Sequence, residues 1–209
     1  MNSVAEQVAS HLLQIKAIKL QPSDPFTWAS GWKSPIYCDN RKTLSYPEVR
    51  TYIRDQFVEL IRSKYPQVEV IAGVATGAIA QGALVAQELG LPFVYVRSSA
   101  KNHGLENLIE GEYKAGQKVV VVEDLISTGG SSLQAVEALR NAGCEVLGLT
   151  AIFTYGFQKA GDNFAAAHCA LDTLSNYGAM IDLAVKTGYI RPNEVEKLKE
   201  WRLNPETYK

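Results

Sequence analysis

Between residues 68 and 155 the sequence alternates between short apolar segments and longer amphipathic ones, and this alternation constrains the fold more than any other feature. We expect strands in the four segments that are short, apolar and rich in β-branched residues, at 68–74, 91–97, 117–125 and 144–155. Two intervening segments, 77–90 and 131–143, have the length of helices and end at glycine, a common helix terminator. We therefore predict an α/β fold with a central, mostly parallel sheet flanked by helices.

Two further helices are expected before this core, at 3–15 and 45–66. Ser3 and Glu6 have the spacing of a capping box at the start of the first helix. Ser45 is the expected cap of the second helix.

The segment 21–42 is rich in proline, aromatic and turn residues, which favours short strands and loops over helix. The tail carries two more helical patterns, at 176–188 and 191–204. At 209 residues, the chain fits a single domain with a small N- and C-terminal cap.

Composition narrows the partners that this chain is expected to have. The net charge is −1 and no basic face is evident, so we expect no nucleic acid partner. No apolar stretch is long enough to span a bilayer, and the first residues lack the pattern of a signal peptide. Three scattered cysteines, Cys38, Cys144 and Cys169, predict neither a disulfide framework nor a zinc site. These observations favour a reduced, cytoplasmic protein.

The connection between Arg97 and Gln117 is much longer than the roughly 2–6 residues usual in α/β proteins. It is polar, contains three glycines, and concentrates Lys101 and His103 close to Arg97. Long loops of this composition commonly act as lids over a site. Closure of such a lid would bring positive charge to a polyanionic ligand, although a solvated surface loop would have the same composition.

The strand at 117–125 ends in two carboxylates, Glu123 and Asp124, and leads directly into a loop with Gly129 and Gly130. Successive backbone N–H groups of such a loop, together with the N-terminus of the following helix, form a site for a phosphate. Carboxylates beside this cup accept hydrogen bonds from sugar hydroxyls, so the pattern suggests a ribose 5-phosphate. Three hydroxyl side chains are candidate donors to the phosphate: Thr128, Ser131 and Ser132.

A plain tight turn with solvated acids would also explain this junction. The sequence contains no G-x-x-x-x-G-K-[ST] motif, and no G-x-G-x-x-G follows a strand, so neither an ATP loop nor a dinucleotide site is supported. The segment 72–79, AGVATGAI, joins a strand to a helix in a similar way. Alone it is weak, because plain packing explains it equally well, but beside the first cup it suggests a ligand with two separated phosphate groups.

Taken together, these motifs resemble the phosphoribosyltransferases, and more narrowly the orotate phosphoribosyltransferase family. The resemblance rests on the sequence EDLISTGGS at 123–131, on the lid sequence RSSAKNHG at 97–104, and on SGWKSPIYCDNR at 30–41, which is similar to the hood motif of that family. EWRLNP at 200–205 is similar to the tail of some bacterial members. The resemblance implies a type I phosphoribosyltransferase fold in one domain, 1–209.

The resemblance also implies how this domain is divided, with a core at about 45–160 and a hood formed by about 20–44 and 165–209. The implied reaction moves the 5-phosphoribosyl group of phosphoribosyl pyrophosphate (PRPP) onto orotate, giving orotidine 5'-monophosphate and pyrophosphate in pyrimidine biosynthesis.

The family implies a role for each matching position. Arg97, Lys101 and His103 of the lid would clamp the pyrophosphate and act in catalysis. Tyr37, Cys38 and Ser127 would contact orotate. The remaining PRPP contacts would come from Thr76, Glu123, Asp124, Leu125, Ile126, Ser127, Thr128, Gly129, Gly130 and Ser131.

Four positions depart from many relatives, which carry basic residues where this chain has Ala29, Gly77, Ser98 and Tyr155. Those basic side chains help to hold the pyrophosphate or the orotate carboxylate. Backbone amides of the hood are therefore the expected partners of the carboxylate in this chain.

The resemblance further implies Mg²⁺ held mainly by the substrate, with no direct protein side chain and Asp124 reaching it through water. A homodimer is implied as well, because the lid of one subunit reaches the site of its neighbour in this family. Two alternatives share the cup: a purine phosphoribosyltransferase, which the lid and hood motifs disfavour, and an RNA-binding regulator, which the slightly acidic balance disfavours.

Overall fold

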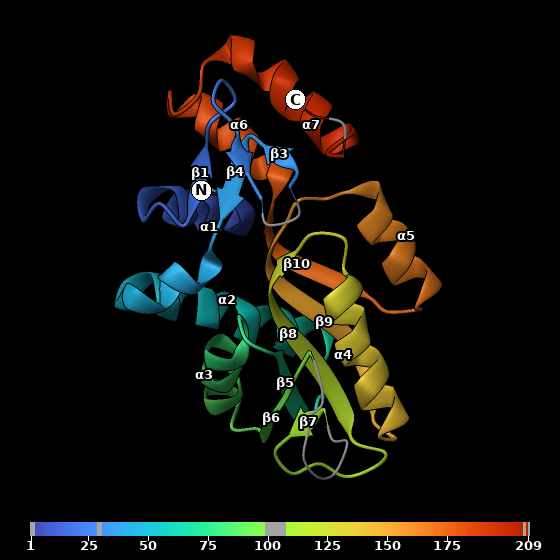
Figure 1. Ribbon diagram of the computed structural model, residues 1–209. Helices are drawn as coiled ribbons and strands as arrows, with labels where there is room; N and C mark the ends of the chain where they lie inside the picture. The colour runs from blue at the N-terminus through green and yellow to red at the C-terminus, as the bar shows by residue number, and fades with distance from the viewer. Residues whose placement is uncertain (1–2, 29–30, 99–107, 207, 209) are drawn as a thin grey trace.

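The computed structural model describes residues 3–28, 31–98, 108–206 and 208, and its centre is a six-stranded sheet (Figure 1). The strands of this sheet are β5 (Val70–Val74), β6 (Phe93–Val96), β7 (Ile109–Glu110), β8 (Lys118–Ile126), β9 (Glu145–Thr154) and β10 (Leu171–Asn176). Their order is β10-β9-β8-β5-β6-β7, and every neighbouring pair is parallel except β6 with β7. The predicted α/β fold with a mostly parallel sheet is confirmed.

The helices are α1 (Val4–Gln14), α2 (Pro47–Lys64), α3 (Ile79–Leu89), α4 (Gly130–Asn141), α5 (Gln158–Ala166), α6 (Tyr177–Lys186) and α7 (Val195–Leu203), with short 3₁₀ helices η1 (Asn40–Ser45) and η2 (Pro192–Glu194). The four valines of β8, 119–122, are fully buried because both faces of the strand are covered. Val120 and Val122 face the cluster built with α1, α2 and α3, whereas Val119 and Val121 face the cluster built with α4 and α5.

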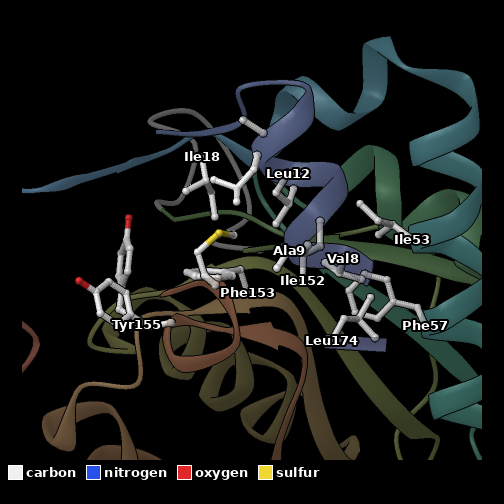
Figure 2. Packing of buried hydrophobic residues seen from close by; sticks show 14 of the residues in the cluster. Val8, Ala9, Leu12, Ile18, Ile53, Phe57, Ile152, Phe153, Tyr155 and Leu174 are labelled. Atoms are coloured by element: carbon white, nitrogen blue, oxygen red, sulfur yellow. The ribbon is translucent and has the colours of Figure 1, made fainter. Parts of the chain in front are cut away.

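The larger of these clusters is drawn in Figure 2. Val8 and Leu12 of α1 pack toward Phe57 of α2 and Phe153 of β9, and all four side chains are fully buried. This packing fixes α1 and α2 against the sheet and so fixes the strand ends that carry the polar junction.

A small cap, which we call the hood, covers one end of the sheet (Figure 1). It consists of the antiparallel pair β1 (Ile18–Leu20) and β4 (Ile36–Cys38), the antiparallel pair β2 (Phe26–Thr27) and β3 (Lys33–Ser34), and helices α6 and α7. The fully buried ring of Trp201 joins these parts, because its centroid lies 5.7 Å from those of Trp28 and Tyr155 and 5.4 Å from that of Tyr177. The hood therefore rests on the carboxyl end of β9 through aromatic contacts.

The predicted helix starts are right in one case and wrong in the other. Ser3 and Glu6 form the predicted capping box, with the Ser3 hydroxyl accepting from the Glu6 N–H at 3.2 Å and the Glu6 carboxylate accepting from the Ser3 N–H at 3.0 Å. Ser45 does not cap α2, because it ends η1 and the N-cap position falls on Tyr46, which makes no side-chain capping bond. Pro47 in the first turn fixes the start of that helix.

Five elements were not predicted from the sequence: β1, η1, β7, α5 and β10. The last of these matters for the domain plan, because β10 pairs with β9 in the main sheet although it lies inside the segment expected to form the hood. Among the residues that the structure describes, no helix is both long enough and apolar enough to cross a membrane.

Candidate active site

The ends of β5 and β8 lie side by side, since these strands are parallel neighbours with Gly73 opposite Val122. The polar junction after β8 therefore meets the turn after β5, as expected for the carboxyl edge of a parallel sheet. A cavity of about 440 Å³ lies there. We call it the acid-lined cavity, and its walls are formed by Cys38, Asp39, Arg41, Val74, Ala75, Thr76, Gly77, Glu123, Asp124, Leu125 and Ser131.

Glu123 is held rigidly at the floor of this cavity, with only 5% of its surface exposed. Its carboxylate accepts the hydroxyl hydrogen of Ser132 at 2.8 Å and the backbone N–H of Asp124 at 2.9 Å. Burial raises the pKa of Glu123 well above its usual range, and the neighbouring charge of Asp124 raises it further. The expectation that Ser132 donates to a phosphate is wrong, because Ser132 is buried and its hydroxyl orients Glu123.

Asp124 is positioned from two sides. Its backbone carbonyl accepts the side-chain N–H of Asn40 at 2.6 Å, which ties the segment after β4 to the end of β8. Its carboxylate lies against the α-carbon of Gly77, where a β-carbon would come within 2.5 Å of the carboxyl carbon. Only glycine at position 77 leaves room for the carboxylate in this orientation.

The loop after β8 turns sharply into α4 at two consecutive glycines. Gly129 adopts the left-handed conformation with φ of 81°, and α4 begins at Gly130 without a side-chain capping bond from Gly129. The first amides of α4 are therefore not capped by that residue and are directed toward the strand ends. The Thr128 carbonyl accepts the side-chain N–H of Asn163 at 2.9 Å, so α5 holds the loop in place.

A second cavity, of about 340 Å³, lies between the hood and the sheet. We call it the aromatic cavity, and its walls are formed by Thr27, Trp28, Tyr37, Cys38, Leu125, Ser127 and Tyr155. Cys38 and Leu125 line both cavities, so the two spaces adjoin. Burial raises the pKa of the Tyr155 phenol and of the Cys38 thiol, so both groups are neutral near pH 7.

Most predicted site residues that the structure describes come together at these two cavities. Tyr37, Cys38 and Ser127 share the aromatic cavity, while Thr76, Glu123 and Asp124 share the acid-lined one. Four residues of the motif line neither cavity: Ile126, whose side chain is fully buried, and Thr128, Gly129 and Gly130 of the loop.

The predicted cationic residues are distributed differently. Arg97 directly follows β6 and lines neither of the two cavities. Its guanidinium lies 3.5 Å from the Glu110 carboxylate. Lys101 and His103, like Ala29 of the hood, lie outside the described residues.

Sequence reasoning missed Asp39, Asn40 and Arg41, which follow the hood strand β4. Asp39 and Arg41 line the acid-lined cavity and form an ion pair at 2.7 Å, while Asn40 is buried and bonded to the Asp124 carbonyl. The signal was present as three consecutive polar residues directly after an apolar strand. Within the described part of the chain, no group of three or more His, Cys, Asp or Glu side chains is arranged to hold a metal ion.

A parallel sheet that ends in an acid pair and a glycine-containing loop, with a hood over an adjoining cavity, agrees with the arrangement expected of a phosphoribosyltransferase. Residues 44–186 match the family model described as "Phosphoribosyl transferase domain". Beyond that class, the chain belongs to the orotate phosphoribosyltransferase family. It is 62% identical over 208 residues to the orotate phosphoribosyltransferase of Porphyromonas gingivalis, covering 100% of this chain and 99% of that protein.

Two further comparisons agree with this assignment. The orotate phosphoribosyltransferase of Lactococcus lactis is 55% identical over 206 residues, which is 99% of each chain. The crystal structure of orotate phosphoribosyltransferase from Aeropyrum pernix superimposes with a TM-score of 0.76 at 28% identity, covering 88% of this chain and 99% of that one. The resemblance on which the type I fold was predicted is thereby confirmed.

Proposed function

We propose that this protein transfers the 5-phosphoribosyl group of PRPP to orotate, giving orotidine 5'-monophosphate and pyrophosphate in the formation of pyrimidine nucleotides. The observation that carries the proposal is the pair of adjoining cavities, one lined by Glu123 and Asp124 and the other by aromatic rings. The shared wall of Cys38 and Leu125 would allow a sugar in the first cavity to react with a flat base in the second.

The acid-lined cavity is the proposed site of PRPP. Its 5-phosphate would bind the amides of the 127–131 loop and the start of α4, where the helix dipole favours negative charge. The ribose hydroxyls would donate to the carboxylates of Glu123 and Asp124. The pyrophosphate would then face the turn containing Thr76 and Gly77, which leaves Arg41 of the opposite wall as a cation beside it.

Orotate would occupy the aromatic cavity between the hood and Ser127. Its ring nitrogen N1, which has already lost its proton to solvent, attacks the anomeric carbon of the ribose. The bond from that carbon to the pyrophosphate oxygen breaks, and its electron pair leaves on pyrophosphate. Positive charge develops on the sugar ring during this step, and the nearby carboxylate of Asp124 stabilises it. No strong general base is required, so the residues act mainly by orienting the two substrates and excluding water.

The donor set suits a magnesium ion carried by the substrate. Asp124 presents a carboxylate to the cavity beside Gly77, and Mg²⁺ commonly keeps several waters and binds one or two carboxylates together with phosphate oxygens. When bound, the ion would neutralise charge on the departing pyrophosphate. Asp124 would orient one of its waters.

The reaction is tested by incubating the protein with orotate and PRPP, with and without magnesium, and separating the products by chromatography. We expect orotidine 5'-monophosphate and pyrophosphate in equal amounts, and neither product after chelation of the metal. Product formation that is unaffected by chelation would show that the reaction does not require the metal. The absence of orotidine 5'-monophosphate under all conditions would contradict the proposed reaction.

We further propose that the protein works as a cytoplasmic homodimer in which Arg97, Lys101 and His103 serve the site of the neighbouring subunit. Mixing two inactive variants, Lys101→Ala and Asp124→Asn, tests this arrangement. If each site draws on both subunits, random reassociation gives heterodimers with one intact site and restores about a quarter of full activity. A mixture that stays inactive after subunit exchange has been verified would place the lid residues in their own subunit's site.

A further inference from the structure

The β2–β3 hairpin of the hood carries a lysine at the rim of the aromatic cavity. Thr27 of β2 lies directly opposite Lys33 of β3 in the strand register. The ammonium group of Lys33 donates a hydrogen bond to the Thr27 hydroxyl at 2.8 Å. Since Thr27 is part of the cavity wall, the positive charge of Lys33 lies within one hydrogen bond of that wall.

The described wall of this cavity contains no lysine, arginine or histidine of its own. A carboxylate entering a space lined by Trp28, Tyr37 and Tyr155 loses water contacts and needs a donor in return. The aromatic surroundings lower the local dielectric, which strengthens any charged hydrogen bond formed there. Lys33 is exposed and its long side chain can turn from the Thr27 hydroxyl to a ligand without disturbing the strand pair.

We propose that Lys33 recognises the carboxylate of orotate and makes the site select a 6-carboxylated pyrimidine over uracil. The Thr27 hydroxyl holds the ammonium group at the rim before the ligand arrives. This inference rests on the proposed placement of orotate in the aromatic cavity. It replaces the backbone amides of the hood, which the sequence alone favoured, as the main partner of the carboxylate.

The test compares two nucleotides that differ only in the carboxylate, orotidine 5'-monophosphate and uridine 5'-monophosphate. Their affinities are measured by calorimetry on the unmodified protein and on the variants Lys33→Met and Lys33→Arg. Lys199→Met is the matched control, because Lys199 is also an exposed hood lysine and forms an ion pair with Glu196 of the same helix.

Loss of one hydrogen bond to a charged group predicts that Lys33→Met binds orotidine 5'-monophosphate about tenfold or more weakly. Uridine 5'-monophosphate should bind the variant as it binds the unmodified protein, Lys33→Arg should recover much of the difference, and the control should change neither affinity. The KM for orotate should rise in parallel with the loss of product affinity.

Two results would overturn the inference. Equal weakening of both nucleotides would mean that Lys33 only supports the hairpin, and an unchanged preference for the carboxylated nucleotide would return the role to the backbone amides. If Lys33→Met does not fold, Lys33→Gln applies the same comparison, because it keeps a polar side chain at this exposed position and removes the charge. Failure of the unmodified protein to convert orotate is a separate result, and it would count against the proposed function instead.

Discussion

The carboxylate of Asp124 occupies the space that a side chain at position 77 would need, because a β-carbon on Gly77 would lie 2.5 Å from the carboxyl carbon. Asp124 lies near the end of β8, and Gly77 lies in the turn after the neighbouring parallel strand β5. Their contact therefore joins the acid pair to the turn that faces the proposed pyrophosphate. The glycine at this position therefore permits a particular position of the acid.

Replacing Gly77 with alanine should displace the Asp124 carboxylate while leaving the fold intact. We expect kcat/KM for PRPP to fall at least tenfold, a loss of roughly 1.4 kcal/mol in transition-state stabilisation. Gly161→Ala is the control, because a β-carbon there meets nothing within 4 Å. Steady-state kinetics equal to those of the control would show that the acid does not need this position.

Asn40 should couple the hood to the acid pair. Asn40→Ala removes the donor to the Asp124 carbonyl and leaves that partly buried oxygen without this bond, at a cost of about 1–3 kcal/mol of unfolding free energy. Activity should fall as well, because the segment after β4 loses its tie to β8. Urea denaturation and kinetics test both effects, with the exposed Asn193→Ala as a control. A stable variant with normal activity would contradict the assignment.

The raised pKa of Glu123 makes stability depend on pH in a predictable direction. An unfolded glutamic acid titrates near about 4.3, whereas burial keeps Glu123 protonated to higher pH in the folded state. The folded state thus binds more protons above that pH, and the free energy of unfolding falls as pH rises toward the raised pKa. Below the pKa of Glu123 in the unfolded state, this residue is protonated in both states, and its titration no longer changes the free energy of unfolding.

Glu123→Gln should therefore gain stability relative to the unmodified protein between about pH 5 and about pH 8. Its amide can still donate to the Ser132 oxygen, so the local bonding pattern is largely kept. Urea denaturation at several pH values measures the difference. If the difference does not change with pH, Glu123 titrates normally in the folded protein.

Arg41 should hold charge on the pyrophosphate side of the site. Arg41→Gln is expected to raise the KM for PRPP and the inhibition constant of pyrophosphate about tenfold, as the loss of one charged hydrogen bond predicts. The KM for orotate should stay unchanged. Arg62→Gln, which removes an exposed guanidinium paired with Glu59, is the control. An equal rise in the KM for PRPP in both variants would mean that the net charge of the protein, and not the position of Arg41, affects PRPP binding.

Lys101 should act mainly in the reaction step. Lys101→Ala should lower kcat far more than it weakens binding of PRPP, because a lid cation is needed most when charge develops on the departing pyrophosphate. Turnover is measured by steady-state kinetics and binding by calorimetry. An unchanged kcat would show that Lys101 does not act in the reaction step.

The sheet was predictable because its strands carry a strong pattern. The run of valines at 119–122 can only be satisfied by burial on both faces, and the turn residues around Gly90 and Gly129 mark where the chain must change direction. By contrast, β10 lies at the sheet edge and contains Asp172 and Thr173. Its sequence is therefore too polar to predict a strand.

The site was predictable where its residues follow one another in the sequence, as in the acid pair followed by the glycine-rich loop. It was not predictable where residues far apart in the chain meet. The bond from Asn40 to Asp124 spans 84 positions, and the approach of Gly77 to Asp124 depends on which strands are neighbours. The role of Ser132 was misjudged for the same reason, since a hydroxyl beside a phosphate loop and one beneath it look alike in the sequence.

The central claim is that the aromatic cavity takes orotate while the acid-lined cavity takes PRPP. The most direct test is to follow consumption of orotate, uracil, adenine and hypoxanthine in parallel, with PRPP and magnesium present and pyrophosphate release recorded. The account predicts that orotate alone is consumed, with one pyrophosphate released for each orotate. Consumption of a purine in place of orotate, or release of pyrophosphate without loss of orotate, would contradict it.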